Sequence, residues 1–370
     1  MKANRLALLT VITFTVIIAA VYTSYYHSPE TGKKKELLFP DLNKKINSVS
    51  KMTIHGNQST ITLRRDGNQW KIKEADDYPA LFDKIKQTVI AVSELKILAY
   101  KTRNVALYPR LGVEDVNKKG AKSKLVTLED NAGNQLASLI AGNKRHSKSA
   151  IGKAGLYVRL PGHDQALLVE GRLDVSANII DWFQRNLFNI EPDRIREIKI
   201  EHKDSDTVML NRRSSEDDFT LVNIPEGKQA KSIVVLNRMK TMLEDTLVDN
   251  VKSAGRTEFP DTQSVATVMT FDGLIATVTS TIIDDTRYAR FAFSYVPPSP
   301  DTTGNSEKPK KKESGSAGKD VGKEVQRLTA NTKDWVYEVP EFKFELFTKK
   351  MDDLVQDIPE EKKAVSGTSK

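Results

Sequence analysis

The feature that most constrains how this chain can fold is an order of apolar segments that occurs twice. One spacing of apolar residues opens both copies: Val49-x-x-Met52-x-Ile54 in the first and, 146 residues later, Ile195-x-x-Ile198-x-Ile200 in the second. Strand-like, helical and again strand-like segments then follow in the same sequence in each copy. One strand could match by chance, but an order kept over a whole domain length predicts two related units.

Each copy is predicted to combine strands with a packed helix. In the first copy, Ile61 and Leu63 alternate with polar residues and lead into Asp66-Gly67-Asn68, a strong hairpin turn. Asp77-Tyr78-Pro79 predicts the start of a helix with proline in its first turn. That helix would bury apolar residues at three- and four-residue spacing: Leu81, Phe82, Ile85, Val89, Val92 and Leu95. Strands are expected again within residues 125–169, and a closing helix within residues 179–187.

The second copy repeats this order. Phe219 takes the position of Trp70, and a helix is expected to bury Val235, Leu236, Met239 and Leu243, with Ser232 as a candidate N-cap. Strands are expected at residues 265–271, 275–283 and 288–295. Residues 335–339 take the place of the strand at residue 166, and a closing helix is expected at residues 344–351.

A separate constraint is the uncharged stretch from Leu6 to Tyr26, which holds 21 residues. As a helix it has about the length needed to cross roughly 30 Å of hydrocarbon. Lys2 and Arg5 precede it, and tyrosines at its far end favour the membrane interface. The predicted membrane-anchor residues are Leu6, Leu8, Leu9, Val11, Ile12, Phe14, Val16, Ile17, Ile18, Val21, Tyr22, Tyr25 and Tyr26.

This stretch is predicted to be a retained anchor rather than a cleaved signal peptide. Its apolar run exceeds a signal-peptide core, and cleavage after Ala20 would leave Ile18 where a small residue is needed. The positive charges before the stretch favour an amino terminus inside the cytoplasm, whereas the lysines at 33–35 favour the opposite orientation. Because a leading segment usually translocates a large body behind it, residues 27–370 are expected outside the cytoplasm.

Composition narrows the classes of function. The chain has 370 residues, 39% apolar and 29% charged, which suits a globular body of two ordinary domains behind the anchor. Part of its formal charge of +8 lies near the membrane segment and in a Lys-rich insertion, so we do not expect a nucleic-acid partner. The absence of cysteine excludes disulfides, thiolate nucleophiles and the common structural zinc sites.

These observations predict an α+β fold: an N-terminal transmembrane helix followed by two related units, each an antiparallel β-sheet with a packed helix. The anchor and tether occupy residues 1–36, the first unit 37–188, the second unit 189–356 and a disordered tail 357–370. Within the second unit, residues 297–323 are rich in Pro, Ser, Gly and Lys and are expected to be disordered.

Short packing and turn motifs run through the first copy: Leu38-Phe39-Pro40-Asp41-Leu42, Trp70-Lys71-Ile72, Tyr78-Pro79-Ala80, Leu111-Gly112-Val113, Val126-Thr127-Leu128-Glu129-Asp130 with Gly133, Gly155-Leu156-Tyr157-Val158-Arg159 and Asp181-Trp182. Together they resemble the domain-of-unknown-function 4340 family over residues 37–250. The resemblance implies a membrane-anchored extracytoplasmic body, and some members of that family resemble auxiliary parts of ABC-type transport or gliding machinery. The Lys-rich insertion departs from the family's pattern, and the motifs supply no catalytic residues.

No arrangement of residues indicates a catalytic, cofactor or metal site. The five histidines do not pair at ligand spacing: His27, His55, His146, His163 and His202. Ser48-Val49-Ser50-Lys51 matches the S-x-x-K pattern of penicillin-binding enzymes, but S-D-N and K-T-G are missing. Residues 318–323 have the wrong spacing for a phosphate loop. Two acidic pairs, Glu129-Asp130 and Asp284-Asp285, are expected at turns, and Trp70, Trp182 and Trp335 are expected in the core rather than along a glycan groove.

The function predicted from the sequence is non-enzymatic. We expect an accessory or scaffold subunit of an envelope transport complex, single-pass in a bacterial inner membrane, with the bulk of the chain in the periplasm. Its expected partners are membrane lipid, through the N-terminal helix, and an integral membrane protein such as an ABC-type permease. The alternative is a glycan- or peptidoglycan-binding envelope module. A hydrolase would need opposed acids across a cleft, which the sequence does not locate.

Overall fold

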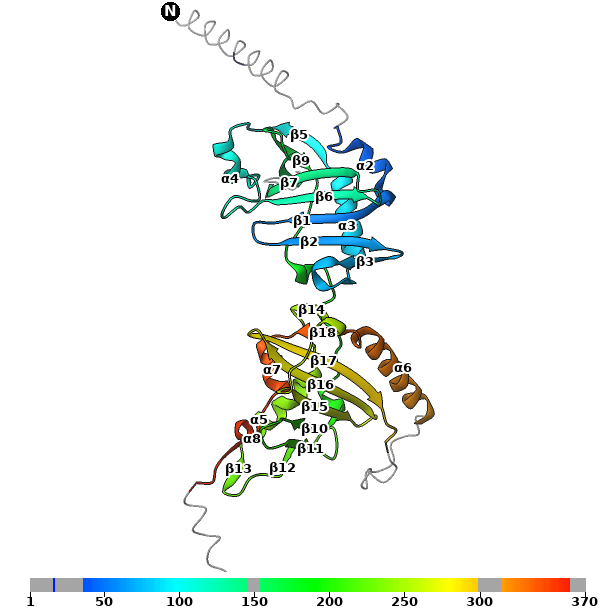
Figure 1. Ribbon diagram of the computed structural model, residues 1–370, viewed down its shortest axis with the longest axis vertical. Coiled ribbons are helices and arrows are strands. Elements are labelled where there is room, and N and C mark those ends of the chain that lie inside the picture. The colour runs from blue at the N-terminus through cyan, green and yellow to red at the C-terminus, as the bar shows by residue number, and fades with distance from the viewer. Residues whose placement is uncertain (1–15, 17–35, 146–153, 299–313, 360–370) are drawn as a thin grey trace, which may run out of the picture.

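The computed structural model describes residue 16 and residues 36–145, 154–298 and 314–359. In this part of the chain, two units follow one another end to end, each built on one large antiparallel sheet with helices packed against it (Figure 1). We call residues 36–183 the N-terminal unit and residues 185–359 the C-terminal unit. The predicted α+β class, with two large antiparallel sheets, is confirmed.

The predicted membrane anchor lies outside the described residues, apart from Val16, which is helical and exposed. Within the described ranges, no helix is both long and apolar enough to cross a bilayer. The anchor therefore stays a prediction from the sequence.

The N-terminal sheet has nine strands in the order β4-β3-β2-β1-β6-β7-β8-β9-β5. These strands are β1 (Val49–His55), β2 (Thr60–Asp66), β3 (Gln69–Ile72), β4 (Tyr78–Pro79), β5 (Lys96–Tyr100), β6 (Lys124–Asp130), β7 (Gln135–Arg145), β8 (Gly155–Arg159) and β9 (Ala166–Glu170). The helices are α2 (Pro40–Lys44), α3 (Phe82–Ser93) and α4 (Tyr108–Leu111), with 3-10 turns η1 (Ile46–Ser48), η2 (Lys73–Ala75), η3 (Val105–Leu107) and η4 (Ile179–Asp181).

The C-terminal sheet has eight strands in the order β12-β11-β10-β15-β16-β17-β18-β14. These strands are β10 (Ile195–Glu201), β11 (Val208–Asn211), β12 (Thr220–Val222), β14 (Asn250–Ser253), β15 (Ser264–Thr270), β16 (Leu274–Ile283), β17 (Thr286–Tyr295) and β18 (Trp335–Glu338). Two short strands, β13 (Lys228–Ala230) and β19 (Val355–Asp357), pair separately. The helices are α5 (Ile233–Asn237), α6 (Ser314–Thr332), α7 (Glu341–Phe347) and α8 (Met351–Leu354), with η5 (Pro192–Arg194), η6 (Arg238–Leu243) and η7 (Ala254–Arg256).

The two sheets place their strands in the same order. The run β3-β2-β1-β6-β7-β8-β9-β5 corresponds strand for strand to β12-β11-β10-β15-β16-β17-β18-β14. A β-bulge also falls at the same place in both: between Val49 and Lys51, where β1 meets β6, and between Ile195 and Glu197, where β10 meets β15. The correspondence therefore extends from strand order to single residue positions.

An arginine beside an aromatic ring, buried at Arg159 and half-buried at Arg290, is a second shared detail. Arg159 pairs with Ile140 across β7 and β8, and Arg290 pairs with Thr279 across β16 and β17. The guanidinium of Arg159 lies 4.8 Å from the Tyr108 ring centre, and that of Arg290 lies 4.1 Å from the Phe259 ring centre. Both rings precede a proline, in Tyr108-Pro109 and Phe259-Pro260.

Helices bury one face of each sheet. In the N-terminal unit, α3 contributes Ile85, Val89 and Val92 to the core, and in the C-terminal unit α7 lies against β15, β16 and β17 while α6 lies against β17. Because successive strand residues point to opposite faces, Leu139 enters this core whereas its neighbour Ile140 does not. Ile140 joins a smaller cluster on the other face, with Tyr108, Val113 and Ala166.

The helix predicted at Asp77-Tyr78-Pro79 begins later than expected. Asp76 and Asp77 adopt left-handed backbone conformations, with φ of 51° and 68°, and the next two residues form β4 against β3. Because Pro79 is used in a strand, α3 starts at Phe82, whose side chain is 54% exposed instead of buried. Ile85 and Val89 are buried, as predicted.

The predicted closing helix of the first copy is also wrong, because only the 3-10 turn η4 forms there. The chain then runs into the next unit, where the backbone of residues 185–190 pairs with residues 243–248. Phe188 packs edge-on against Phe291 and Phe293, at 5.2 Å between ring centres in both contacts. These contacts place the boundary between the units before Arg185.

The prediction of a disordered insertion is wrong for residues 314–323, which belong to α6. Val321 and Leu328 are buried on this helix, and Glu324 forms an ion pair of 2.8 Å with Arg194. Few apolar residues suffice because they fall at helical spacing on one face. Residues 299–313 lie outside the described residues.

A matched pair of glycines tests the correspondence between the sheets. Gly133 and Gly273 follow β6 and β15, with φ of 82° and 91°. A Cβ on Gly273 would lie 2.2 Å from the Val296 carbonyl oxygen, whereas one on Gly133 would meet nothing within 4 Å. We expect Gly133→Ala to cost about 1 kcal/mol from backbone strain, and Gly273→Ala about 3 kcal/mol because residues 296–298 must move as well. Urea unfolding of both variants measures this difference, and equal costs would contradict it.

Candidate functional site

A hollow lies at the β-bulge of the N-terminal sheet. Its volume is about 570 Å³, and it is bordered by η1, the start of β1, the β2–β3 hairpin and the β6–β7 turn. Its polar lining includes Asn47, Ser48, Ser50, Arg65, Asp130 and Asn131. The Asp130 carboxylate accepts hydrogen bonds from the side chain and backbone of Asn134 and from the Ala132 backbone, which holds its pKa below the ordinary value.

The same place in the C-terminal unit is filled. Arg212 follows β11 as Arg65 follows the equivalent residues of β2. The guanidinium of Arg212 donates to the carbonyl oxygens of Ile195 (2.7 Å), Pro192 (2.8 Å) and Ser215 (2.6 Å). Burial lowers the pKa of this guanidinium.

Aromatic rings enclose the Arg212 guanidinium, whose centre lies 5.3 Å from the Phe219 ring and 5.5 Å from the Phe271 ring. The counterpart of Phe271 in the N-terminal unit is the smaller Asn131, and Arg65 is exposed with its Nε donating to the Gly67 carbonyl at 3.0 Å. The hollow is therefore open because one ring is missing and one arginine points outward.

The residues weighed as catalytic in the sequence take part in ordinary packing and surface contacts. Lys51 forms an ion pair of 2.8 Å with Glu129, while Ser48 ends η1 at the border of the hollow. His55 contacts Thr60 and Asn117, and His202 contacts Ser264 and the Lys349 carbonyl. In the described ranges, no three His, Asp or Glu side chains are grouped to hold a metal. Trp70 and Trp182 are buried in the core, as predicted, and Trp335 is half-buried.

A second candidate region is the joint between the two units. The Asp76 carboxylate accepts a hydrogen bond from the Ser253 backbone at 2.9 Å and forms an ion pair of 2.9 Å with Arg256. The left-handed backbone at Asp76 aims its carboxylate out of the N-terminal unit at the end of η2. These contacts connect the η2–β4 turn with β14 and η7.

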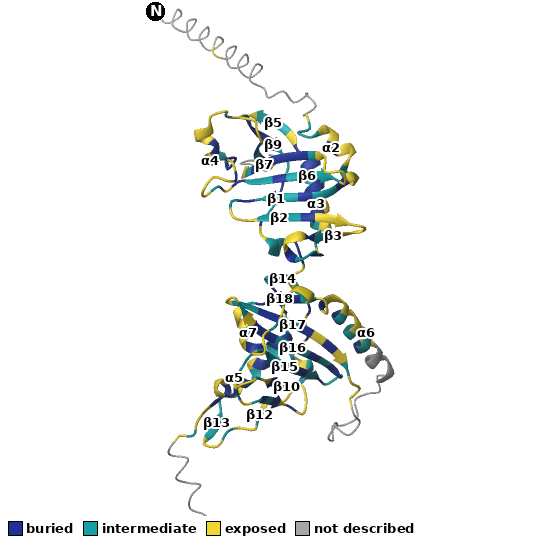
Figure 2. Ribbon diagram, viewed as in Figure 1, coloured by how far each residue is buried: buried dark blue, intermediate teal, exposed yellow. Residues whose placement is uncertain are grey.

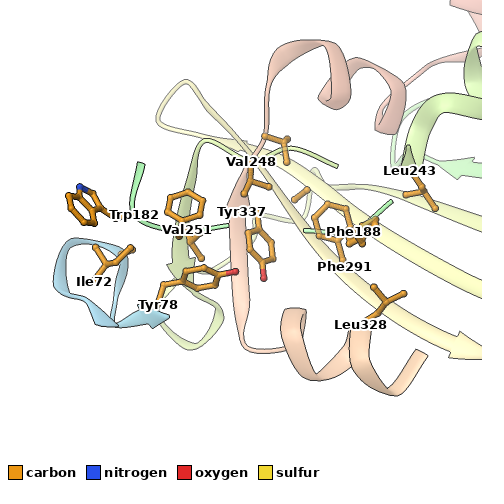
Figure 3. Packing of buried hydrophobic residues seen from close by; sticks show 14 of the residues in the cluster. Ile72, Tyr78, Trp182, Phe188, Leu243, Val248, Val251, Phe291, Leu328 and Tyr337 are labelled. Carbon is orange, nitrogen blue, oxygen red and sulfur yellow. The ribbon is translucent and has the colours of Figure 1, made fainter. Parts of the chain in front are cut away.

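Aromatic rings fill the joint beside this ion pair. The Tyr78 ring packs edge-on against Phe183 of its own unit at 5.7 Å and against Trp335 and Tyr337 of the C-terminal unit at 4.8 and 6.3 Å. Figure 3 shows buried side chains running without a break from Ile72 and Trp182 through this joint to Phe291. Burial raises the pKa of the Tyr337 phenol, whose hydroxyl donates to the Asn331 carbonyl at 3.1 Å.

Comparison with known protein families gives a match. The family described as "Domain of unknown function (DUF4340)" matches residues 42–266, more than half of the chain. The chain belongs to the DUF4340 family. The DUF4340 match begins in α2, covers the N-terminal sheet and the joint residues 76–78 and 253–256, and ends in β15. Searches of curated proteins and of solved structures gave no match.

Sequence reasoning did not find the residues of the joint. Tyr78 was expected in a helix, and Trp335 lies 257 residues further along the chain, so no local pattern connects the two. The hollow carried a weak signal, because aligning the two copies sets Asn131 against Phe271. That alignment shows which copy lacks the ring.

Proposed function

We propose that this DUF4340 protein is a membrane-anchored accessory or scaffold subunit of an envelope transport complex, non-enzymatic, with residues 6–26 as its anchor. The described body would stand in the periplasm of a bacterium, and an integral membrane protein such as an ABC-type permease would be its partner. The observation that supports this most is the joint, because a continuous core through both units makes an extended body that can hold a partner at a set distance from the bilayer.

We also infer that the two units are related by duplication of one ancestral unit. The shared strand order, the β-bulge at matching positions and the arginine beside an aromatic ring support this. The two units differ at the hollow and at the insertion, so one chain has two different surfaces. A scaffold needs such surfaces to bind different partners.

Membrane fractionation tests the anchor. The full chain is expected to stay with membranes after alkaline extraction, and a variant lacking residues 6–26 is expected to be released. Because the chain has no cysteine, one introduced at the exposed Val234 reports the side of the membrane through a membrane-impermeant maleimide on intact spheroplasts. Release of the full chain, or labelling only after lysis, would overturn this part of the proposal.

Affinity purification after crosslinking in intact cells tests the partner. A tagged full chain is expected to recover an integral membrane permease together with its ATPase, and the variant lacking residues 6–26 serves as the matched control. Recovery of the tagged chain without any membrane protein would contradict the scaffold role.

The hollow favours one second candidate, a glycan-binding module. Its hydroxyl and amide groups on Asn47, Ser48, Ser50 and Asn131 suit a sugar. Co-sedimentation with insoluble cell wall separates the two functions. Retention that is lost in Asn131→Phe, which would fill the hollow as Phe271 does in the other unit, would favour the glycan module.

A further inference from the structure

The described body begins on the outer side of β5. The carbonyl oxygen of Glu36 accepts a hydrogen bond from the Ile97 backbone at 2.9 Å, and the Leu38 backbone donates to the Leu95 carbonyl at 2.8 Å. Leu37 forms an isolated bridge with Lys96. Since β5 is the last strand of its sheet, the chain enters the body at this edge, at the end of the N-terminal unit that lies away from the C-terminal unit (Figure 1).

Three apolar side chains are exposed on the segment that follows β5. Tyr100, Val105 and Leu107 are 67%, 49% and 36% exposed. Four exposed cations lie on the same segment, at Lys96, Lys101, Arg103 and Arg110. No acidic residue occurs from position 96 to 113, and the acidic neighbour across the sheet is Glu170, opposite Lys96. Figure 2 shows exposed residues on α4. We call the three apolar residues and the four cations the tether-side surface.

The fold keeps this surface facing outward. Tyr108, next to Leu107, is buried, and its hydroxyl donates to the Asp164 carbonyl at 2.5 Å. The side chain of Asn104 accepts a hydrogen bond from the Ala106 backbone at 3.0 Å and so caps η3. With Tyr108 turned inward and η3 capped, Val105 and Leu107 are presented on a short ordered turn.

We propose that the tether-side surface rests on the head-group region of a bilayer that contains anionic lipid. This inference rests on the proposed anchor at residues 6–26. The nine residues 27–35 can span at most about 30 Å, so β5 must lie near the membrane if the anchor does. Exposed tyrosine and aliphatic side chains on one segment with lysine and arginine match the chemistry of an interface with acidic head groups.

The C-terminal unit shows what the corresponding surface does when it contacts protein. The residues after β14 include Arg256, Glu258 and Asp261, and Arg256 pairs with Asp76 of the N-terminal unit. If a second copy of the chain docked on the tether-side surface by the same kind of contact, its Asp76 would have to pair with a cation of that surface. Asp76 already accepts hydrogen bonds from Ser253 and Arg256 of its own chain. The mixed charges after β14 contrast with the segment from 96 to 113, whose charged residues are all cationic, and this contrast favours lipid.

Depth-dependent fluorescence quenching tests the proposal on the full chain in lipid nanodiscs. Leu107→Cys and, as a control, Val234→Cys (75% exposed in the native chain, in the C-terminal unit) each provide the single thiol for an environment-sensitive dye. With doxyl-labelled lipid in discs of phosphatidylcholine and phosphatidylglycerol, the dye at position 107 is expected to lose at least half its emission. The dye at position 234 is expected to lose less than a tenth.

The charge requirement is tested in the same discs. Lys101→Gln with Arg103→Gln is expected to halve the quenching at position 107, and discs of phosphatidylcholine alone are expected to do the same. If the chain enters the discs but the dye at position 107 is quenched no more than the dye at position 234, the proposed lipid contact of the tether-side surface is wrong. The proposed anchor at residues 6–26 is then still supported. If the chain does not enter the discs, the proposed anchor fails first. The unlabelled Leu107→Cys chain in the same discs provides a free thiol, and its ready formation of a disulfide between two chains under mild oxidation would assign the surface to a second copy and overturn the proposal.

Discussion

Replacing Tyr78 by alanine is expected to turn one cooperative unfolding transition into two. The ring lies between Phe183 on one side and Trp335 and Tyr337 on the other, so its removal leaves a cavity at the joint. Truncation of a buried aromatic side chain costs about 3–5 kcal/mol of the free energy of unfolding. Because the Tyr78 ring contacts both units, this loss weakens the interaction between them. Urea unfolding followed by tryptophan fluorescence reports both units, because Trp70 and Trp182 lie in one and Trp335 in the other.

Two controls make this result specific. Tyr78→Phe retains the ring and is expected to unfold in one transition near the midpoint of the native chain. Tyr108→Ala removes a ring that is also buried but belongs to the smaller cluster under α4, away from the joint. It is expected to lower stability without separating the transitions. A single transition in Tyr78→Ala at the native midpoint would show that the units are not coupled through this ring.

The strands that the sequence predicted best are those whose side chains alternate between core and surface. Val49, Met52 and Ile54 are buried on β1 while the residues between them are less so, and Ile195, Ile198 and Ile200 repeat the pattern on β10. Such alternation is a local property, so it can be recognised without knowing the neighbouring strands. The DUF4340 resemblance, which other short motifs carried, is confirmed by the family match over residues 42–266.

What the sequence could not reveal depends on contacts between distant residues. The edge strands β5 and β14 were missed, because β5 has no clear alternation and β14 has one buried residue, Val251. Their place in the sheets comes from pairing with β9 and β18. Pro79 is typical of the first turn of a helix. The left-handed backbone at Asp76 and Asp77 instead turns the chain so that Pro79 belongs to β4. Tertiary contacts outweighed local preference at each of these positions.

Arg212→Met is expected to destabilise the protein by about 3 kcal/mol, whereas Arg65→Met at the matching position should change stability by less than about 0.5 kcal/mol. Arg212 is buried, and its loss would leave the carbonyl oxygens of Ile195, Pro192 and Ser215 without their donor. Methionine avoids the cost of burying a charge, which is the same cost that lowers the pKa of Arg212. Avoiding the buried charge offsets only part of the destabilisation, because three carbonyl oxygens lose their hydrogen-bond donor together.

Arg65 is the matched control because it comes next after Arg64 of β2, as Arg212 comes next after the corresponding Asn211 of β11, but it lies exposed beside the open hollow. Chemical denaturation of both variants, with the slope of the transition checked against the native chain, gives the two costs. Similar losses in the two variants would mean that Arg65 turns into the hollow in solution and closes it as Arg212 does. The hollow would then be a second copy of a packed arginine site, and the glycan-binding alternative would lose the space that it needs. A large difference instead means that divergence between the units has opened one site while the other stays filled.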